Sequence, residues 1–462
     1  MIRVHRISCL LAASVLLAAS TATMGQDFDV AALRDAAMED DLAYEMVEGL
    51  TTEIGPRMPG TEAEARARDW AVATFEELGF ENVRIETFEM PVWVRGEETA
   101  QVVSPFPQPL RLTALGNSGA TPEDGLTAEV VFFENFDALV DAEVGSLDGK
   151  IAFVTHDMTP TQDGSGYGQF GVARFQGPNV AAKKGAAAYV VKSIGTDHGR
   201  GPHAGNTSFE EDVEPIPAAA LSTSDARNLQ RMIERADEPV VLKLVLTPRN
   251  LGMQESGNVI AEVPGSDPDA GIVLIGGHLD SWDLGTGAID DASGCAITAA
   301  AAKRIMDAGQ PRRTIRVVWF GAEEVGVFGG RAYQEAHAED PHVLAAESDF
   351  GADRVWRLET TLPEEAAALH DRLAAALAPL GIVASNAPAS GGADVRPTIA
   401  SGVAAVDLGQ DGLRYFDLHH TPEDTLDAVD PEQLRQNVAA WTAMLAIVAN
   451  APEEIGPIER EE

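Results

Sequence analysis

The stretch from residue 276 to residue 294, GGHLDSWDLGTGAIDDASG, combines one histidine with four aspartates. It also contains Trp282 and Ile289, which indicate that part of it is buried. Buried carboxylates need partners, because an unpaired charge in a medium of low dielectric constant costs several kcal/mol. Arginine, water or a metal ion could supply the partner, and this stretch alone does not decide between them.

Further acids and histidines follow other predicted strands. The candidate residues, in chain order, are His278, Asp280, Asp290, Glu323, Glu324, Asp349, His419 and His420. Histidines with several carboxylates form a ligand set that divalent cations favour, zinc first. Because a carboxylate has two oxygens, one aspartate can bridge two metal ions about 3.5–4 Å apart. In the pair Glu323–Glu324, one residue can bind metal while the other acts as a general base. The spacing His-x-Asp would let Asp280 support the ring of His278.

Each of these residues taken alone has a more ordinary explanation. A single buried histidine is more often a core residue than a ligand, and a Glu-Glu pair usually lies on a solvated face. Asp290 and Asp291 precede a predicted helix, so they could serve as an N-cap and a first-turn acid. The metal hypothesis therefore depends on their joint position at the ends of predicted strands.

The elements that must position these residues form an α/β pattern after residue 250. The predicted strands are NVIAEVPG, AGIVLIGGHLD, RRTIRVVWFGAEEVG and VAAVDLG, and SGCAITAAAAKRIMDAG is a predicted helix. Unbroken aliphatic strands that alternate with helices imply a sheet covered on both faces. Chemistry in such sheets gathers beyond the carboxyl ends of the strands. We therefore predict an α/β fold, with a mixed, mostly parallel sheet sandwiched by helices.

The local composition and residue pattern of the chain predict four parts. The basic start and the short apolar run from Ile7 to Ala19 are typical of a cleaved export signal, and no later segment is long and apolar enough to span a membrane. Short β-like runs between Gly-, Asp- and Pro-rich turns, with one helix-like piece, GPNVAAKKGA, predict a β-rich inserted domain. The predicted parts are a signal peptide at 1–25, the two halves of the α/β domain at 26–104 and 250–455, and the inserted domain at 105–249.

Composition narrows the range of partners. The chain has 33 Lys and Arg residues against 73 Asp and Glu residues, a formal net charge of −40. Such a charge argues against nucleic acid or an anionic membrane surface as a partner. Without the predicted signal the chain keeps only Cys295, so an intrachain disulfide is not expected.

The motifs GGHLDSWDLGTGAIDDASG, WFGAEEVGVFGG, ESDFG and HHTPEDTLD resemble those of the zinc-dependent exopeptidase family, peptidase clan MH, family 28. This family contains bacterial leucyl aminopeptidases, glutamate carboxypeptidase II and plasma glutamate carboxypeptidase. The upstream segments GPRMPGT and PVWVRGEE resemble the plasma glutamate carboxypeptidase (carboxypeptidase Q) branch in particular. The resemblance covers essentially the whole mature chain, and it implies that the insertion is a protease-associated domain.

The resemblance also implies two zinc ions per chain and a role for each site residue. The family's ligand positions fall on His278, Asp290, Glu324, Asp349 and His420. Asp290 would bridge the two ions, and His420 is preferred to His419 because the family's ligand directly precedes Ser or Thr. Glu323 would be the general base that takes a proton from water and later returns it to the leaving amine.

The predicted function is that of an exported exopeptidase acting at a terminus of short peptides or dipeptides, and the resemblance suggests a homodimer. An aminopeptidase would hold the substrate ammonium with acids, whereas a carboxypeptidase would need a cation. Arg57, Arg396 and Arg414 could supply it, although each could instead be a structural ion-pair partner. Glutaminyl cyclase activity with one zinc, or a receptor-like binding module on the same fold, are the alternatives.

The positions of four further residues can also be predicted. Trp282 and Tyr415 could line a substrate pocket or pack in the core. His198 and His203, in the predicted insertion, are expected at the surface rather than as ligands.

Overall fold

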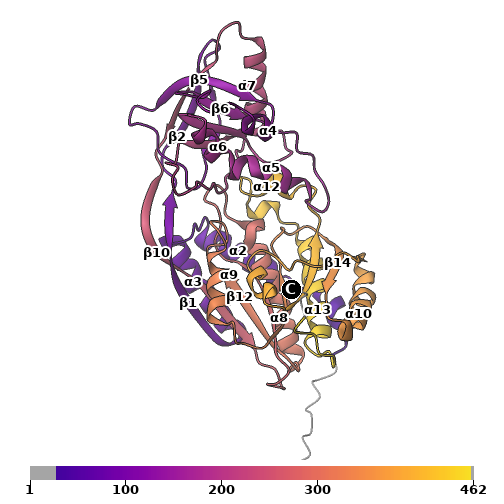
Figure 1. Ribbon diagram of the computed structural model, residues 1–462. Helices are drawn as coiled ribbons and strands as arrows, with labels where there is room; N and C mark the ends of the chain where they lie inside the picture. Colours follow the sequence, from indigo (N-terminus) through magenta and orange to yellow (C-terminus); the bar gives the residue numbers. More distant parts are fainter. Residues whose placement is uncertain (1–27, 459–462) are drawn as a thin grey trace, which may run out of the picture.

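The computed structural model describes residues 28–458, so the predicted signal peptide lies outside the described residues. The described chain forms two bodies, each built on its own sheet (Figure 1). The lower body in the figure combines the beginning and the end of the chain, and the upper body is formed by the segment between them.

The first sheet has eight strands in the order β1–β10–β12–β11–β13–β16–β14–β15. The four central strands, from β12 to β16 in this order, are parallel, whereas β1, β10 and β14 make the antiparallel pairings. This arrangement confirms the predicted mixed, mostly parallel sheet. The strands are β1 (Glu81–Val94), β10 (Arg249–Val263), β11 (Ile272–His278), β12 (Thr314–Phe320), β13 (His342–Glu347), β14 (Val355–Thr361), β15 (Val383–Ala384) and β16 (Ala404–Gln410).

Helices cover both faces of this sheet, because alternate residues of its central strands are apolar on both sides. Val273 and Ile275 of β11 belong to the larger buried cluster, whereas Leu274 between them belongs to a smaller one. Helices that contribute to the larger cluster are α1 (Val30–Ala37), α2 (Leu42–Gly49), α3 (Glu62–Leu78), α8 (Ser293–Ala308), α10 (Ala367–Leu377) and α13 (Pro431–Val448). Helices α9 (Phe328–Ala336) and α11 (Arg396–Ala400) contribute to the smaller one.

Helix α3 shows how the local sequence sets the bounds of an element. Its N-cap is Thr61, whose hydroxyl accepts a hydrogen bond from the N–H of Glu64. It ends at Gly79, which adopts the left-handed conformation with φ of 84°.

The inserted domain has a second eight-stranded sheet, in the order β3–β2–β9–β5–β6–β7–β8–β4. Its strands are β2 (Glu98–Ser104), β3 (Gln108–Leu110), β4 (Leu112–Ala114), β5 (Leu126–Phe133), β6 (Ile151–Val154), β7 (Ala188–Lys192), β8 (Ala218–Leu221) and β9 (Val241–Leu246). Its helices are α4 (Phe136–Val140), α5 (Gly166–Phe175), α6 (Gly177–Lys183) and α7 (Thr223–Arg235). Only the region of α6 was predicted as helical. The sheet includes β2, which precedes the boundary predicted at residue 105.

A two-stranded ribbon joins the two bodies along one side of the molecule (Figure 1). Strand β1 pairs with β10 over its whole length, from Glu81 opposite Glu262 to Val94 opposite Arg249. Beyond the ribbon the two connections stay adjacent, because a Cβ on Gly96 would lie only 2.0 Å from the carbonyl oxygen of Thr247. The residues described here include no helix with the length and apolar character needed to cross a membrane.

Candidate metal centre

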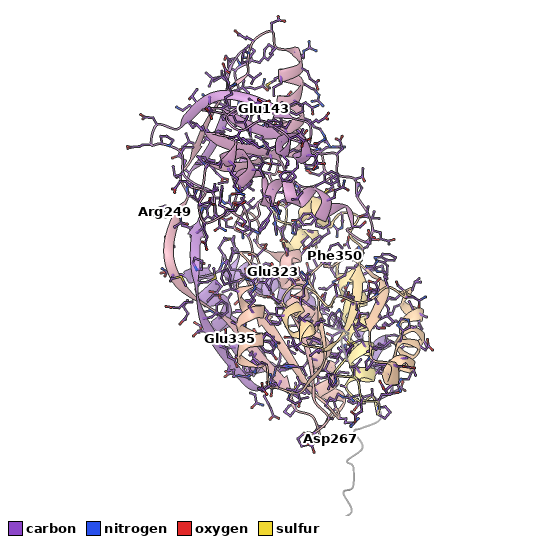
Figure 2. The ribbon with its side chains drawn as sticks, viewed as in Figure 1. Glu143, Arg249, Asp267, Glu323, Glu335 and Phe350 are labelled. Carbon is purple, nitrogen blue, oxygen red and sulfur yellow. The ribbon has the colours of Figure 1, made fainter. Side chains whose placement is uncertain are left out.

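The carboxyl ends of three neighbouring parallel strands bring the predicted site residues together. His278 ends β11, Glu323 and Glu324 follow β12, and Asp349 follows β13. His420 comes from the segment after β16, just beyond the short helix α12 (Tyr415–Leu418). Figure 2 shows Glu323 on the side of the first body that faces the inserted domain. The residues therefore gather at the edge of the sheet where the sequence predicts them.

Asp290 lies at the centre of this cluster. Its Oδ1 is 3.2 Å from Nε2 of His278, and its Oδ2 is 3.2 Å from Nε2 of His420. Each histidine also faces a second carboxylate: Nε2 of His278 is 3.6 Å from Oδ1 of Asp349, and Nε2 of His420 is 2.9 Å from Oε2 of Glu324. The two oxygens of one aspartate thus face two separate His–carboxylate pairs.

These atoms fit a pair of divalent cations. Asp290 is only 3% exposed, and its Oδ2 accepts no hydrogen bond even though it is buried. Burial disfavours charge on His420, but the carboxylates of Glu324 and Asp290 outweigh it and raise the pKa of the ring to about 10. The cluster therefore demands positive charge, which protons or metal ions can supply. Imidazole nitrogens and carboxylate oxygens are the ligands that zinc prefers.

Asp280 contacts the ring of His278 through its main chain more closely than through its carboxylate. Nδ1 of His278 lies 2.9 Å from the main-chain oxygen of Asp280, whereas the Asp280 carboxylate is 3.7 Å away. Because a carbonyl only accepts, Nδ1 carries a proton, and in the neutral ring the lone pair would then be on Nε2, where a metal could bind. The carboxylate of Asp280 instead accepts hydrogen bonds from the N–H groups of Glu323 and Glu324, at 3.0 and 3.2 Å. Asp280 therefore positions the turn that carries both glutamates.

The Asp290–Asp291 pair combines the two explanations that the sequence left open. Asp291 accepts hydrogen bonds from the N–H of Gly294, in the first turn of α8, and from the N–H of His278, at 2.9 and 3.1 Å. Asp291 thus ties the first turn of α8 to the end of β11, while Asp290 faces the histidines.

Glu323 is a partly buried carboxylate with other carboxylates close by. Burial, together with the negative charges of Asp349 and Glu324, raises the pKa of Glu323 well above its usual range. Glu324, in contrast, is engaged with His420. Both lie in the turn beyond β12, where Ala322 has a φ of 58°. This difference suits a proton-transfer role for Glu323 and a ligand role for Glu324.

His419 lies close to the centre but in a less direct position. Its Nε2 is 3.7 Å from Oδ2 of Asp290, and its ring stacks on that of His420 with the centroids 3.4 Å apart. Burial and the neighbouring charge of His420 lower the pKa of His419 well below its usual range. The choice of His420 as the ligand stays a prediction, with the shorter distances in its favour.

Two positioning contacts were not predicted. The N–H of Ala204, in the inserted domain, donates to the His420 carbonyl at 2.8 Å, and the Ala204 oxygen lies 3.3 Å from Nδ1 of that ring. Asp424 accepts hydrogen bonds from the N–H groups of Ala288 and Ile289, both at 2.7 Å. Asp424 lies within the motif HHTPEDTLD, so the sequence pointed to a role for it. The contact of Ala204 is made by its main chain, so the residue type could not have predicted it.

The three candidate arginines have different surroundings. Arg57 is fully buried and donates to the main-chain oxygens of Leu279, Thr286 and Gly287, so its role is structural. Arg414 forms an ion pair with Asp353. Arg396 lines a cavity beside the metal centre.

Of the other residues, Trp282 and Tyr415 are both buried, and their rings lie 5.8 Å from His420 and 5.0 Å from His419. His198 is exposed. The prediction that His203 lies at the surface was wrong, since the residue is only 1% exposed. In this buried position its main-chain N–H donates to the hydroxyl of Ser193, and its ring faces the carbonyl of Ile194.

Comparison with known proteins identifies the class of enzyme. Residues 258–445 match Peptidase family M28. Carboxypeptidase Q of Mus musculus is 33% identical over 416 residues, which span 89% of this chain and 86% of that protein. A crystal structure of a Peptidase M28 precursor from Shewanella amazonensis SB2B is 46% identical, with a TM-score of 0.90, and the match covers 94% of this chain and 98% of that one. The zinc aminopeptidase BSAP of Bacillus subtilis shares the fold, with a TM-score of 0.63 at 21% identity over 91% of this chain and 98% of that one.

The fold and these similarities define a zinc metallopeptidase, a hydrolase of peptide bonds. The chain belongs to peptidase family M28.

Replacement of Arg57 tests how the ligand loop is held. Arg57→Met removes donors from several buried carbonyl oxygens, so we expect the free energy of unfolding to fall by at least about 3 kcal/mol. Zinc content should fall with it, because the loop carries Asp290. Urea denaturation and metal analysis measure the two effects. Arg372→Met, at a half-exposed ion pair with Glu453, is the control, and a loss no larger for Arg57→Met than for this control would contradict the account.

Proposed function

We propose that this chain is a di-zinc exopeptidase that hydrolyses short peptides or dipeptides at a terminus, in the manner of carboxypeptidase Q. The observation that carries the proposal is the position of Asp290 between two histidines, each paired with a second carboxylate. The similarity to carboxypeptidase Q along 89% of the chain supports the choice within the family.

His278, Asp290 and Asp349 would hold one ion, and Asp290, Glu324 and His420 the other. Bound zinc would polarise the peptide carbonyl and lower the pKa of a water molecule. Glu323 accepts the proton of the attacking water and returns it to the nitrogen of the leaving amine. The carboxylate of Asp280 holds the main chain of Glu323 in place for both transfers. Asp280 thus serves the reaction as a positioning residue.

The proposal extends to the setting of the enzyme. The basic, then apolar, start of the sequence supports export, and the net charge of −40 supports a partner other than nucleic acid. The inserted domain would be of the protease-associated type, and the active form would be a homodimer.

Glu323→Gln separates catalysis from metal binding. We expect kcat to fall by about 10²–10⁴, because the amide cannot accept a proton, while two zinc ions per chain remain bound. Activity assays and metal analysis on the same preparation measure both. The exposed Glu335 of α9 (Figure 2) gives the control variant Glu335→Gln. A Glu323→Gln enzyme with more than about a tenth of the original activity would refute the role of general base.

One dipeptide in three forms tests the direction of attack. We expect the free and the amino-blocked dipeptide to be cleaved and the carboxyl amide to resist, because a carboxypeptidase reads the terminal carboxylate. A chelator should abolish the cleavage, and added zinc should restore it. Cleavage of the amide with an inert amino-blocked form would make the enzyme an aminopeptidase. Cleavage that survives chelation would contradict the metal mechanism.

A further inference from the structure

A cavity of about 320 Å³ opens directly beside the metal centre. Asp349, the proposed ligand after β13, lines it together with Phe350, and β16 contributes the segment from Asp407 to Gln410. Figure 2 shows Phe350 on the same side of the first body as Glu323. The volume is in the range of small-ligand sites. A substrate whose scissile bond lies at the metal centre would therefore reach this cavity with a neighbouring group.

Four acidic residues line the cavity, and each contacts another group of the protein. Asp163 accepts a hydrogen bond from the N–H of Ser165 at 3.1 Å. Asp407 accepts hydrogen bonds from the N–H groups of Ser390 and Gly391, at 2.7 and 2.6 Å. Glu347 accepts one from the N–H of Asp394 through Oε2, at 2.8 Å, while its Oε1 is buried without a hydrogen-bond partner. Asp349 faces His278. Asp407 and Asp349 thus already serve the loop and the candidate metal centre.

The two cations of the cavity have free donors. Nε of Arg357, on β14, is buried and has no hydrogen-bond partner, although another nitrogen of the group lies 3.2 Å from Glu359. The exposed side chain of Arg396, at the start of α11, makes no ion pair or hydrogen bond with any residue that the structure describes.

We infer that this cavity binds a carboxylate of the peptide substrate, with Arg357 and Arg396 as its donors. A planar guanidinium matches a carboxylate with two parallel hydrogen bonds. In a chain with a net charge of −40, a local pair of cations also offsets the general repulsion of an anionic peptide. The inference rests on the proposed function. The carboxylate is either the free terminus of the substrate or an acidic side chain.

Binding measurements on a protein that does not turn substrate over test this assignment. Calorimetry on zinc-loaded Glu323→Gln would compare a neutral dipeptide, its carboxyl amide, and the amide of a dipeptide with one acidic side chain. Arg396→Gln and Arg357→Gln would each be added to this background, with Arg372→Gln as the control. We expect the arginine variants to raise the Kd about 10–100-fold for the peptide whose carboxylate occupies the cavity, which is either the free dipeptide or the acidic amide. The Kd of the neutral amide should change less than about twofold.

Loss of affinity for the free dipeptide alone would assign the cavity to the terminal carboxylate. Loss for the acidic amide alone would assign it to a side chain, and both outcomes support the inference. Equal losses for all three peptides, or none for any, would overturn it. Because Arg396 is exposed, its variant decides the question even if the half-buried Arg357 variant does not fold. Failure of the proposed function would appear separately, as absence of chelator-sensitive cleavage by the unmodified enzyme.

Discussion

The concentration of buried negative charge around Asp290 is the constraint on which the rest of the site depends. Isolated carboxylates in such surroundings are costly, so each one needs a cation or several hydrogen-bond donors. Asp290 faces two imidazoles, Asp280 and Asp291 each accept two main-chain N–H groups, and the guanidinium of Arg57 lies nearby. The donors come from β11, the turn after β12 and the first turn of α8. The same contacts that neutralise charge therefore also set the positions of the ligands.

The inserted domain is part of this arrangement, because it holds the segment that carries His420. Both main-chain groups of Ala204 contact His420, and the N–H and hydroxyl of Thr196 both donate to Asp417 of α12 at 2.7 Å. The ring of Tyr167, in α5, stacks on that of Phe416 with the centroids 4.3 Å apart. One half of the metal centre therefore depends on contacts between the two bodies, whereas the half around His278 is built within the first sheet.

The sequence predicted the features that follow from periodicity and from residue type. Unbroken aliphatic strands gave the parallel sheet, and the acids and histidines at their ends gave the cluster around Asp290. It could not give contacts made by the main chain, such as the carbonyl of Asp280 behind His278 or that of Ala204 behind His420. The expectation that His203 lies at the surface also failed, because the type of a single polar residue does not show whether the fold will bury it. The helices α5 and α7 were missed because short turns surround them and β-like runs dominate that region.

The central claim is that Asp290 bridges two zinc ions. Anomalous diffraction at the zinc edge from crystals of the zinc-loaded protein tests it directly. The account predicts two peaks about 3.5–4 Å apart on either side of Asp290, one beside His278 and Asp349 and the other beside Glu324 and His420. A single peak, or a second ion bound by His419 in place of His420, would contradict it.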